Sequence, residues 1–172
     1  MHSIAWWPTL VVVVIATIWD LRSRRIPNWL VAPFLLAGLI TLTATQGLHG
    51  LAQSLEGVLL AVLLLGILYW LGGMGMGDVK LCAAVGAWVG PGQLMLALVL
   101  MGMAGGLIAL VWAIRGGFLK ESLAGTGELV FGSWKRGFRS HTKLVLSNPE
   151  ARKMPYAPAI AIGTILSFLA IP

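Results

Sequence analysis

Apolar residues fill six long runs of the chain, and charged residues lie almost entirely between these runs. Runs that approach 20 apolar residues have the length that a helix needs to cross a bilayer. The pattern predicts an all-α integral membrane protein with six transmembrane helices, at residues 4–19, 29–45, 51–71, 74–90, 93–114 and 155–171. Because six spans leave residues only for loops and ends, we expect residues 1–172 to form a single membrane-embedded domain.

The fourth run is the shortest, since its apolar core covers only Val79–Val89. At about 1.5 Å per residue it would reach only about half of the ~30 Å hydrocarbon layer. We therefore predict that this helix begins earlier, between Met74 and Gly77. That start would draw Asp78 below the membrane surface.

Composition excludes a soluble globular fold, because 58% of the residues are hydrophobic and 10% are charged, against roughly 25% charged in ordinary soluble domains. Cys82 is the only cysteine, which excludes an intramolecular disulfide, a C-x-x-C pair and a multi-cysteine zinc site. The three histidines are isolated from one another in the sequence. We expect no metal and no cofactor.

Basic residues indicate how the chain is oriented in the membrane. All 12 Lys and Arg residues lie in or next to odd-numbered connections: three at 22–25, Lys80 at the start of the fourth run, and eight in 115–154. The even-numbered connections, 46–50 and 90–92, carry none. The positive-inside bias therefore predicts cytoplasmic odd connections and both chain ends on the other side of an inner membrane, and it explains the net charge of +6 without nucleic-acid binding. For the basic and apolar connection 115–154 we predict a helix on the anionic cytoplasmic surface.

Glycine spacing suggests where helices pack. Gly102 and Gly106 have the small-xxx-small spacing that lets transmembrane helices approach closely. We expect this pair to lie at a helix contact.

Only two aspartates occur in the chain, Asp20 and Asp78, and the predicted topology puts both at cytoplasmic ends of spans. An acid at membrane depth costs up to about 2.5–3.5 kcal/mol. Taken singly, each has a structural explanation: Asp78 can cap a helix, and Asp20 can pair with a nearby arginine such as Arg22. Four glycines lie among residues 72–77, however, which is more than a helix cap requires.

Together, the residues around the two aspartates resemble a known family. Asp20 with Ile26–Asn28, and Gly75–Lys80 around Asp78, resemble the two signature motifs of the type IV prepilin leader peptidases, a branch of the GxGD intramembrane aspartyl proteases. The run Pro155–Gly163 resembles the last span of the small subgroup that serves Flp (tight-adherence) pili.

The resemblance implies an aspartic endopeptidase, a hydrolase that removes the short basic leader of prepilins at the cytoplasmic face. It makes Asp20 and Asp78 the catalytic pair, and it suggests that Gly75, Gly77, Lys80, Pro27 and Asn28 bind or orient the substrate. Larger members carry paired C-x-x-C motifs associated with N-methylation, which this sequence lacks. We therefore do not expect methyl transfer.

Two carboxyls that share a site suit this chemistry, because like charges disfavour double ionisation and leave one acid and one base. The base can activate a water while the acid protonates the substrate carbonyl, although the sequence does not assign the two roles. The expected partners are prepilins, membrane lipids and pilus-assembly machinery. The main alternative is a proton-coupled transporter, which would place ionisable residues near the middle of its spans; only Glu56 approaches such a position. A non-catalytic scaffold would leave the pairing of the two aspartates unexplained.

Overall fold

The protein is entirely α-helical in the part that the computed structural model describes, residues 2–23, 25–71, 73–115 and 156–170. Its helices in chain order are α1 (His2–Ser23), α2 (Asn28–Trp70), α3 (Met76–Arg115) and α6 (Ala157–Ala170). Three of them, α1, α2 and α3, are long and apolar enough to cross a membrane. The predicted surface helix in 115–154 lies outside the described residues, apart from Arg115.

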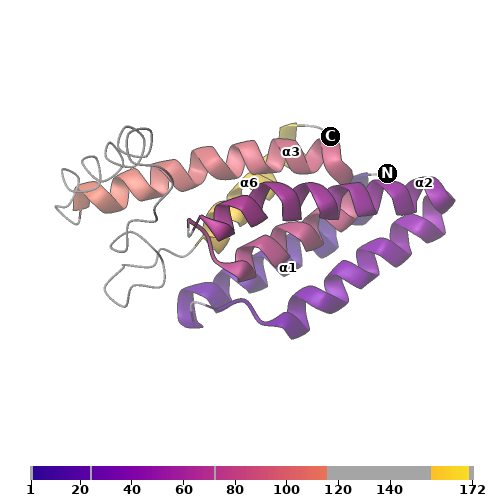
Figure 1. Cartoon of the computed structure of the whole chain (residues 1–172), viewed down its shortest axis with the longest axis horizontal. Coiled ribbons are helices and arrows are strands. Elements are labelled where there is room, and N and C mark those ends of the chain that lie inside the picture. Colours follow the sequence, from indigo (N-terminus) through magenta and orange to yellow (C-terminus); the bar gives the residue numbers. More distant parts are fainter. Residues whose placement is uncertain (1, 24, 72, 116–155, 171–172) are drawn as a thin grey trace.

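Helix α2 consists of two antiparallel legs, 28–46 and 48–70, joined at Gly47 (Figure 1). Gly47 has φ 65° and ψ −144°, a conformation that L side chains rarely adopt. The Trp88 indole donates a hydrogen bond of 2.8 Å to the Phe34 carbonyl, while Ser54 donates to the carbonyl of neighbouring Ala87. In a straight helix Phe34 and Ser54 would be about 30 Å apart. The chain must therefore reverse between them.

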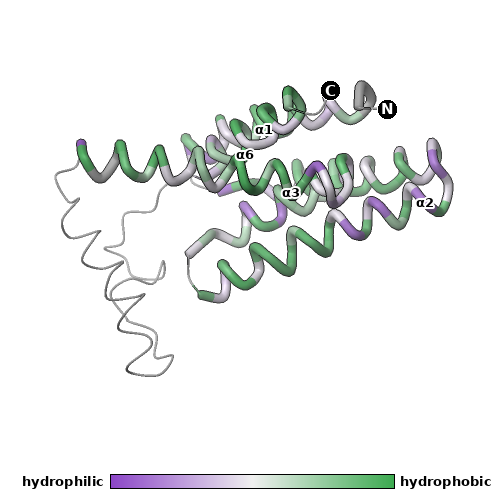
Figure 2. The backbone as a smooth tube through the Cα atoms, turned by 90° about the horizontal axis from the view of Figure 1, so that it is seen from above, coloured by the Kyte–Doolittle hydropathy of each residue, from purple (hydrophilic) through white to green (hydrophobic). Residues whose placement is uncertain are grey.

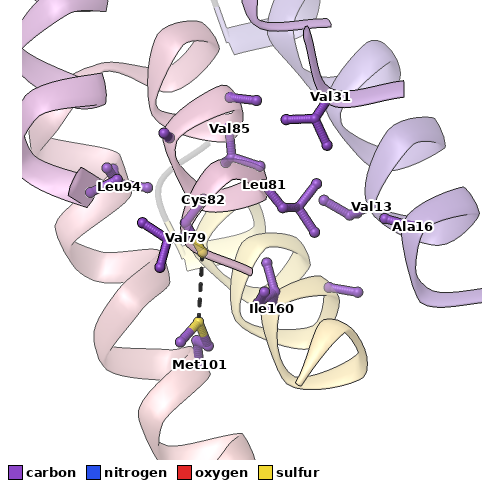
Figure 3. Close-up of a cluster of buried hydrophobic side chains, with 14 of the residues drawn as sticks. Val13, Ala16, Val31, Val79, Leu81, Cys82, Val85, Leu94, Met101 and Ile160 are labelled. Carbon is purple, nitrogen blue, oxygen red and sulfur yellow. Dashed lines mark hydrogen bonds between the residues drawn. The ribbon is translucent and has the colours of Figure 1, made fainter. Parts of the chain in front are cut away.

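Helix α3 folds back in the same way at Gly90, whose φ is 75°, and Pro91 starts the second leg. Its legs are 76–89 and 91–115. The sulfur atoms of Cys82 and Met101 lie 4.0 Å apart across the legs (Figure 3), although a straight helix would separate these residues by about 28 Å. The expected connections 46–50 and 90–92 were thus too long, because in each case one glycine interrupts the helix.

The first leg of α3 is the centre of the bundle. It begins at Met76, inside the expected window 74–77, and all residues of 81–88 are buried. Figure 3 shows its side chains surrounded by residues of α1, α2 and α6, including Val13, Val31 and Ile160. Small residues allow helices to pack closely around this leg. The apolar run that is shortest in the sequence therefore lies at the centre of the bundle.

A close helix contact joins Gly57 of α2 and Gly86 of α3. A Cβ atom at Gly86 would lie 2.6 Å from the Gly57 carbonyl oxygen, inside any tolerable contact. In contrast, Gly102 and Gly106 meet nothing within 4 Å, so the predicted packing of this pair is wrong within the described chain. Since every face of these helices is apolar, spacing alone does not identify the glycines that pack.

Large hydrophobic side chains cover the outside of the bundle, and Figure 2 shows hydrophobic residues along most of each helix. Leu48 is 83% exposed and Trp70 is 85% exposed. Soluble proteins rarely carry so much apolar surface, whereas a lipid environment requires it.

Helices α1 and α6 are antiparallel neighbours. The rings of Trp6 and Phe168 meet edge to face, with centroids 4.9 Å apart, while Thr17 near the other end of α1 contacts Ala157 at the start of α6. The end of α1, both ends of α2 and the starts of α3 and α6 therefore lie at one end of the bundle (Figure 1).

Candidate active site

Asp20 is held inside the last turns of α1, which continues to Ser23 rather than ending at the expected residue 19. Its side chain is only 7% exposed. The backbone N–H of Ala157, the first residue of α6, donates a 3.3 Å hydrogen bond to the Asp20 carboxylate. The carboxylate therefore satisfies one of the unpaired N–H groups at the start of another helix, where the helix dipole favours negative charge.

Thr17, in the preceding turn of α1, contacts the same residue, Ala157. Its hydroxyl is the donor within hydrogen-bond distance of two carbonyl oxygens, that of Val13 at 2.7 Å and that of Ala157 at 3.2 Å. Because residues three apart lie on one helix face, Thr17 and Asp20 contact the carbonyl and the N–H of Ala157 together. The start of α6 is thereby fixed against the aspartate.

Asp78 occupies the first turn of α3 and is 8% exposed. Its backbone N–H donates to the Gly75 carbonyl at 3.2 Å, and its carboxylate accepts a hydrogen bond from the backbone of Gly75. An acid that reaches back to the residue before the helix is the acidic half of a capping box. The capping role expected from the sequence is therefore present, at the third helical position rather than at the cap itself.

Gly75 permits the Asp78 carboxylate to lie unusually close to the backbone. A Cβ atom at position 75 would lie 3.0 Å from Oδ2 of Asp78, tighter than nine in ten real Cβ contacts. One glycine of the motif therefore has a specific steric role beside the acid.

The two aspartates lie at the same end of the bundle, within range for their carboxylates to repel each other. Both side chains are buried, so water screens their repulsion only weakly. The pair therefore resists holding two negative charges at once, and one proton shared between two carboxyls is the arrangement that general acid–base hydrolysis needs.

The loop before α2 packs on the glycine-rich start of α3. Pro27 is the N-cap of α2 in an extended conformation, and its carbonyl accepts hydrogen bonds from the first turn of that helix. Asn28 accepts a 3.3 Å hydrogen bond from the Lys80 ammonium. A Cβ atom at Gly77 would lie 3.3 Å from Cβ of Ile26. Two motifs about 50 residues apart in sequence thus form one contiguous surface beside the aspartates.

Sequence reasoning missed Thr17 and Tyr156. Tyr156 directly precedes Ala157, is half-buried and lies within electrostatic range of Asp78. The resemblance of Pro155–Gly163 to a family segment marked the region of Tyr156 without giving that residue a role, and the quoted motifs did not include Thr17. Within the helices and loops described, no three His, Cys, Asp or Glu side chains converge to hold a metal ion.

Comparison with known proteins gives a family match. The family model described as the type IV leader peptidase family matches residues 7–110, more than half of the chain and both aspartates. Over 78% of its length the chain is 30% identical to a prepilin leader peptidase/N-methyltransferase of Pectobacterium carotovorum subsp. carotovorum. Over 58% of its length it is 34% identical to the protein of that name in Aeromonas hydrophila.

The chain spans half or less of these relatives, 50% of the Pectobacterium protein and 36% of the Aeromonas protein. No solved structure matches it. The family match covers most of α1, all of α2 and most of α3 in their order along the chain, including the segments that carry Asp20 and Asp78. The chain belongs to the type IV leader peptidase family.

Proposed function

We propose that this protein is an intramembrane aspartyl endopeptidase that removes the leader peptide from type IV prepilins, with Asp20 and Asp78 as its catalytic pair. The observation that carries the proposal is that the only two aspartates of the chain are both buried and interact at one end of the bundle. In the mechanism, the ionised carboxyl takes a proton from water, the water attacks the scissile carbonyl, and the protonated carboxyl donates to the carbonyl oxygen.

Surrounding residues would position the pair and the substrate. Gly75 leaves room for the Asp78 carboxylate, and Gly77 lets Ile26 approach the start of α3. The hydrogen bond from Lys80 to Asn28 ties the two motif segments together, and Pro27 fixes where α2 begins. An extended prepilin segment could then lie across this surface with its scissile bond at the two carboxyls.

The proposed topology has six passes and places the aspartates at the cytoplasmic face. The legs of α2 and α3 support it, because helices of 43 and 40 residues would be about 65 and 60 Å long if straight, twice the ~30 Å hydrocarbon layer. Arg22, Arg25 and Lys80 lie at the aspartate end of the bundle, as the positive-inside bias requires. Both termini would then be outside the cytoplasm, in an inner-membrane protein.

The preferred substrate would be an Flp-type prepilin, with a basic leader in the cytoplasm and an apolar helix in the membrane. This finer assignment rests on the resemblance of Pro155–Gly163 to the Flp subgroup, and on the start of α6 contacting Asp20. The proposal is confined to cleavage and does not extend to methyl transfer.

Co-expression with a candidate Flp-type prepilin tests the activity, with leader removal measured as a gel shift. We expect Asp20→Asn and Asp78→Asn each to abolish cleavage, since an amide keeps the shape of the side chain but cannot exchange the proton. Glu56→Gln is the matched control, because it removes an exposed carboxyl from the second leg of α2. Full cleavage by either aspartate variant, with the protein present in the membrane, would refute the mechanism.

A further inference from the structure

A groove of about 380 Å³ lies between the two legs of α2 and the first leg of α3. One side comes from residues of 28–35, the second from residues of 58–69 and the third from residues of 76–83. Its volume falls in the range of small-molecule sites. The proposed peptidase mechanism uses Asn28 and Lys80 at one end of this groove, but none of its apolar lining.

Polar groups gather at one end of this groove. Asn28 starts α2, Tyr69 nearly ends it and Lys80 lies in the first turns of α3, so all three lie at the aspartate end of the bundle. Lys80 is the charged residue of the lining, and its exposed ammonium bonds Asn28 at 3.3 Å. The other lining residues are apolar or glycine. A groove with a cation at one end and an apolar lining along the rest complements an amphiphile with an anionic head group.

The groove has the depth of one membrane leaflet. From Tyr69 to Val58 the second leg of α2 rises about 16 Å, and half of a ~30 Å hydrocarbon layer is about 15 Å. A single acyl chain extending from the Lys80 end would therefore stay within one leaflet.

The groove and the aspartates lie on different faces of α3. At about 100° per residue, Asp78 is separated by 100° or more from the lining residues Val79, Lys80 and Ala83. A peptide lying along the groove would thus direct its backbone away from the carboxyls.

We propose that this groove binds an anionic phospholipid, with the phosphate at Lys80 and Asn28 and one acyl chain along Val62 and Gly66. Asp20 and Asp78 are not part of this site, which shares Asn28 and Lys80 with the proposed substrate surface. In the proposed topology it faces the cytoplasmic leaflet, which is the leaflet whose anionic lipids attract basic groups close to the membrane.

The test measures lipid binding to the delipidated full-length protein by native mass spectrometry, with palmitoyl-oleoyl phosphatidylglycerol and the corresponding phosphatidylcholine as probes. We expect the wild type to retain the anionic lipid preferentially. Lys80→Gln should weaken phosphatidylglycerol binding about fivefold and leave phosphatidylcholine binding unchanged.

Gly66→Leu should abolish the preferential binding because it fills the groove. No atom lies within 4 Å of a Cβ built at Gly66, so the added side chain extends into the groove rather than into the protein. Gly102→Leu is the matched control, since that glycine also meets nothing within 4 Å but lies on the second leg of α3, outside the groove.

Three results would overturn the proposal. The first is equal binding of the two lipids by the wild type. The second is unchanged phosphatidylglycerol binding in Gly66→Leu with a melting temperature equal to that of Gly102→Leu. The third is displacement of the bound lipid by a prepilin peptide, which would make the groove part of the substrate site. Cleavage and lipid binding are tested separately: loss of cleavage in the aspartate variants with lipid binding intact would support both proposals.

Discussion

The contact between Gly57 and Gly86 gives a quantitative test of how tightly this bundle is packed. We consider Gly86→Ala, which adds one methyl group at the crossing of α2 and α3. The new Cβ would lie 2.6 Å from the Gly57 carbonyl oxygen and 2.8 Å from its carbon, both backbone atoms that cannot rotate away. Ordinary contact begins near 3.4 Å, so the helices must separate by about 0.8 Å.

That separation has a cost in the free energy of unfolding. Overpacking a close-packed interior by one methyl group typically costs about 1–3 kcal/mol. The hydrogen bond from Ser54 to the Ala87 carbonyl lies at the same crossing and would be stretched. Alanine recovers up to about 1 kcal/mol as a better helix former than glycine. Gly102→Ala gains this same term without the clash, because it meets nothing within 4 Å.

The difference between the two variants therefore isolates the packing cost, about 1–3 kcal/mol in favour of Gly102→Ala. Unfolding in mixed micelles with increasing sodium dodecyl sulfate, followed by tryptophan fluorescence, measures it. Equal stability of the two proteins would refute the close contact and, with it, the placement of the central leg of α3.

Three further outcomes are expected. Thr17→Val should slow prepilin cleavage about fivefold, because it removes the hydroxyl that contacts the start of α6. Thr17→Ser keeps the hydroxyl and should retain most activity. A valine variant as fast as the wild type would contradict the positioning role of Thr17. In intact cells, a cysteine introduced at exposed Leu48 should react with a membrane-impermeant thiol reagent from outside only, and a cysteine introduced at Arg25 should react from the cytoplasm only. Buried Cys82 should give little background labelling. Labelling of both introduced cysteines from one side would refute the six-pass topology. Cleavage should survive EDTA and serine-directed reagents and should fall at both low and high pH, where the base is protonated or the acid is ionised; inhibition by chelation that zinc reverses would exclude the aspartyl mechanism.

The helical architecture could be predicted because apolar runs of bilayer length have few alternatives. The turns could not be predicted in detail. Gly47 and Gly90 each reverse the chain with a single positive-φ residue, so helical hydrogen bonding resumes at once and the apparent connections shrink. Packing was harder still, because helices that are apolar on all sides carry no amphipathic signal for the inward face.

Both aspartates could be identified from the sequence because an acid at membrane depth is costly and this chain has only two. Their position at one end of the bundle was predicted by counting spans, because both aspartates fall at span ends on the same side of the membrane. The hydrogen bond from Ala157 to Asp20 was not, since the two residues are 137 positions apart and the donor is a backbone group with no signature of its own. The same holds for Gly75, whose role depends on the side-chain conformation of Asp78.

The contact between Asp20 and the start of α6 also sets the order in which the site is assembled during synthesis. Asp20 leaves the ribosome early, on α1, and Asp78 follows on α3, but the N–H group that Asp20 accepts from belongs to a helix made much later. Until α6 enters the membrane and packs along α1, the buried carboxylate lacks this partner. If the pair is catalytic as proposed, a partly synthesised chain would lack the finished site, and substrate helices inserting nearby at the same time would not meet it.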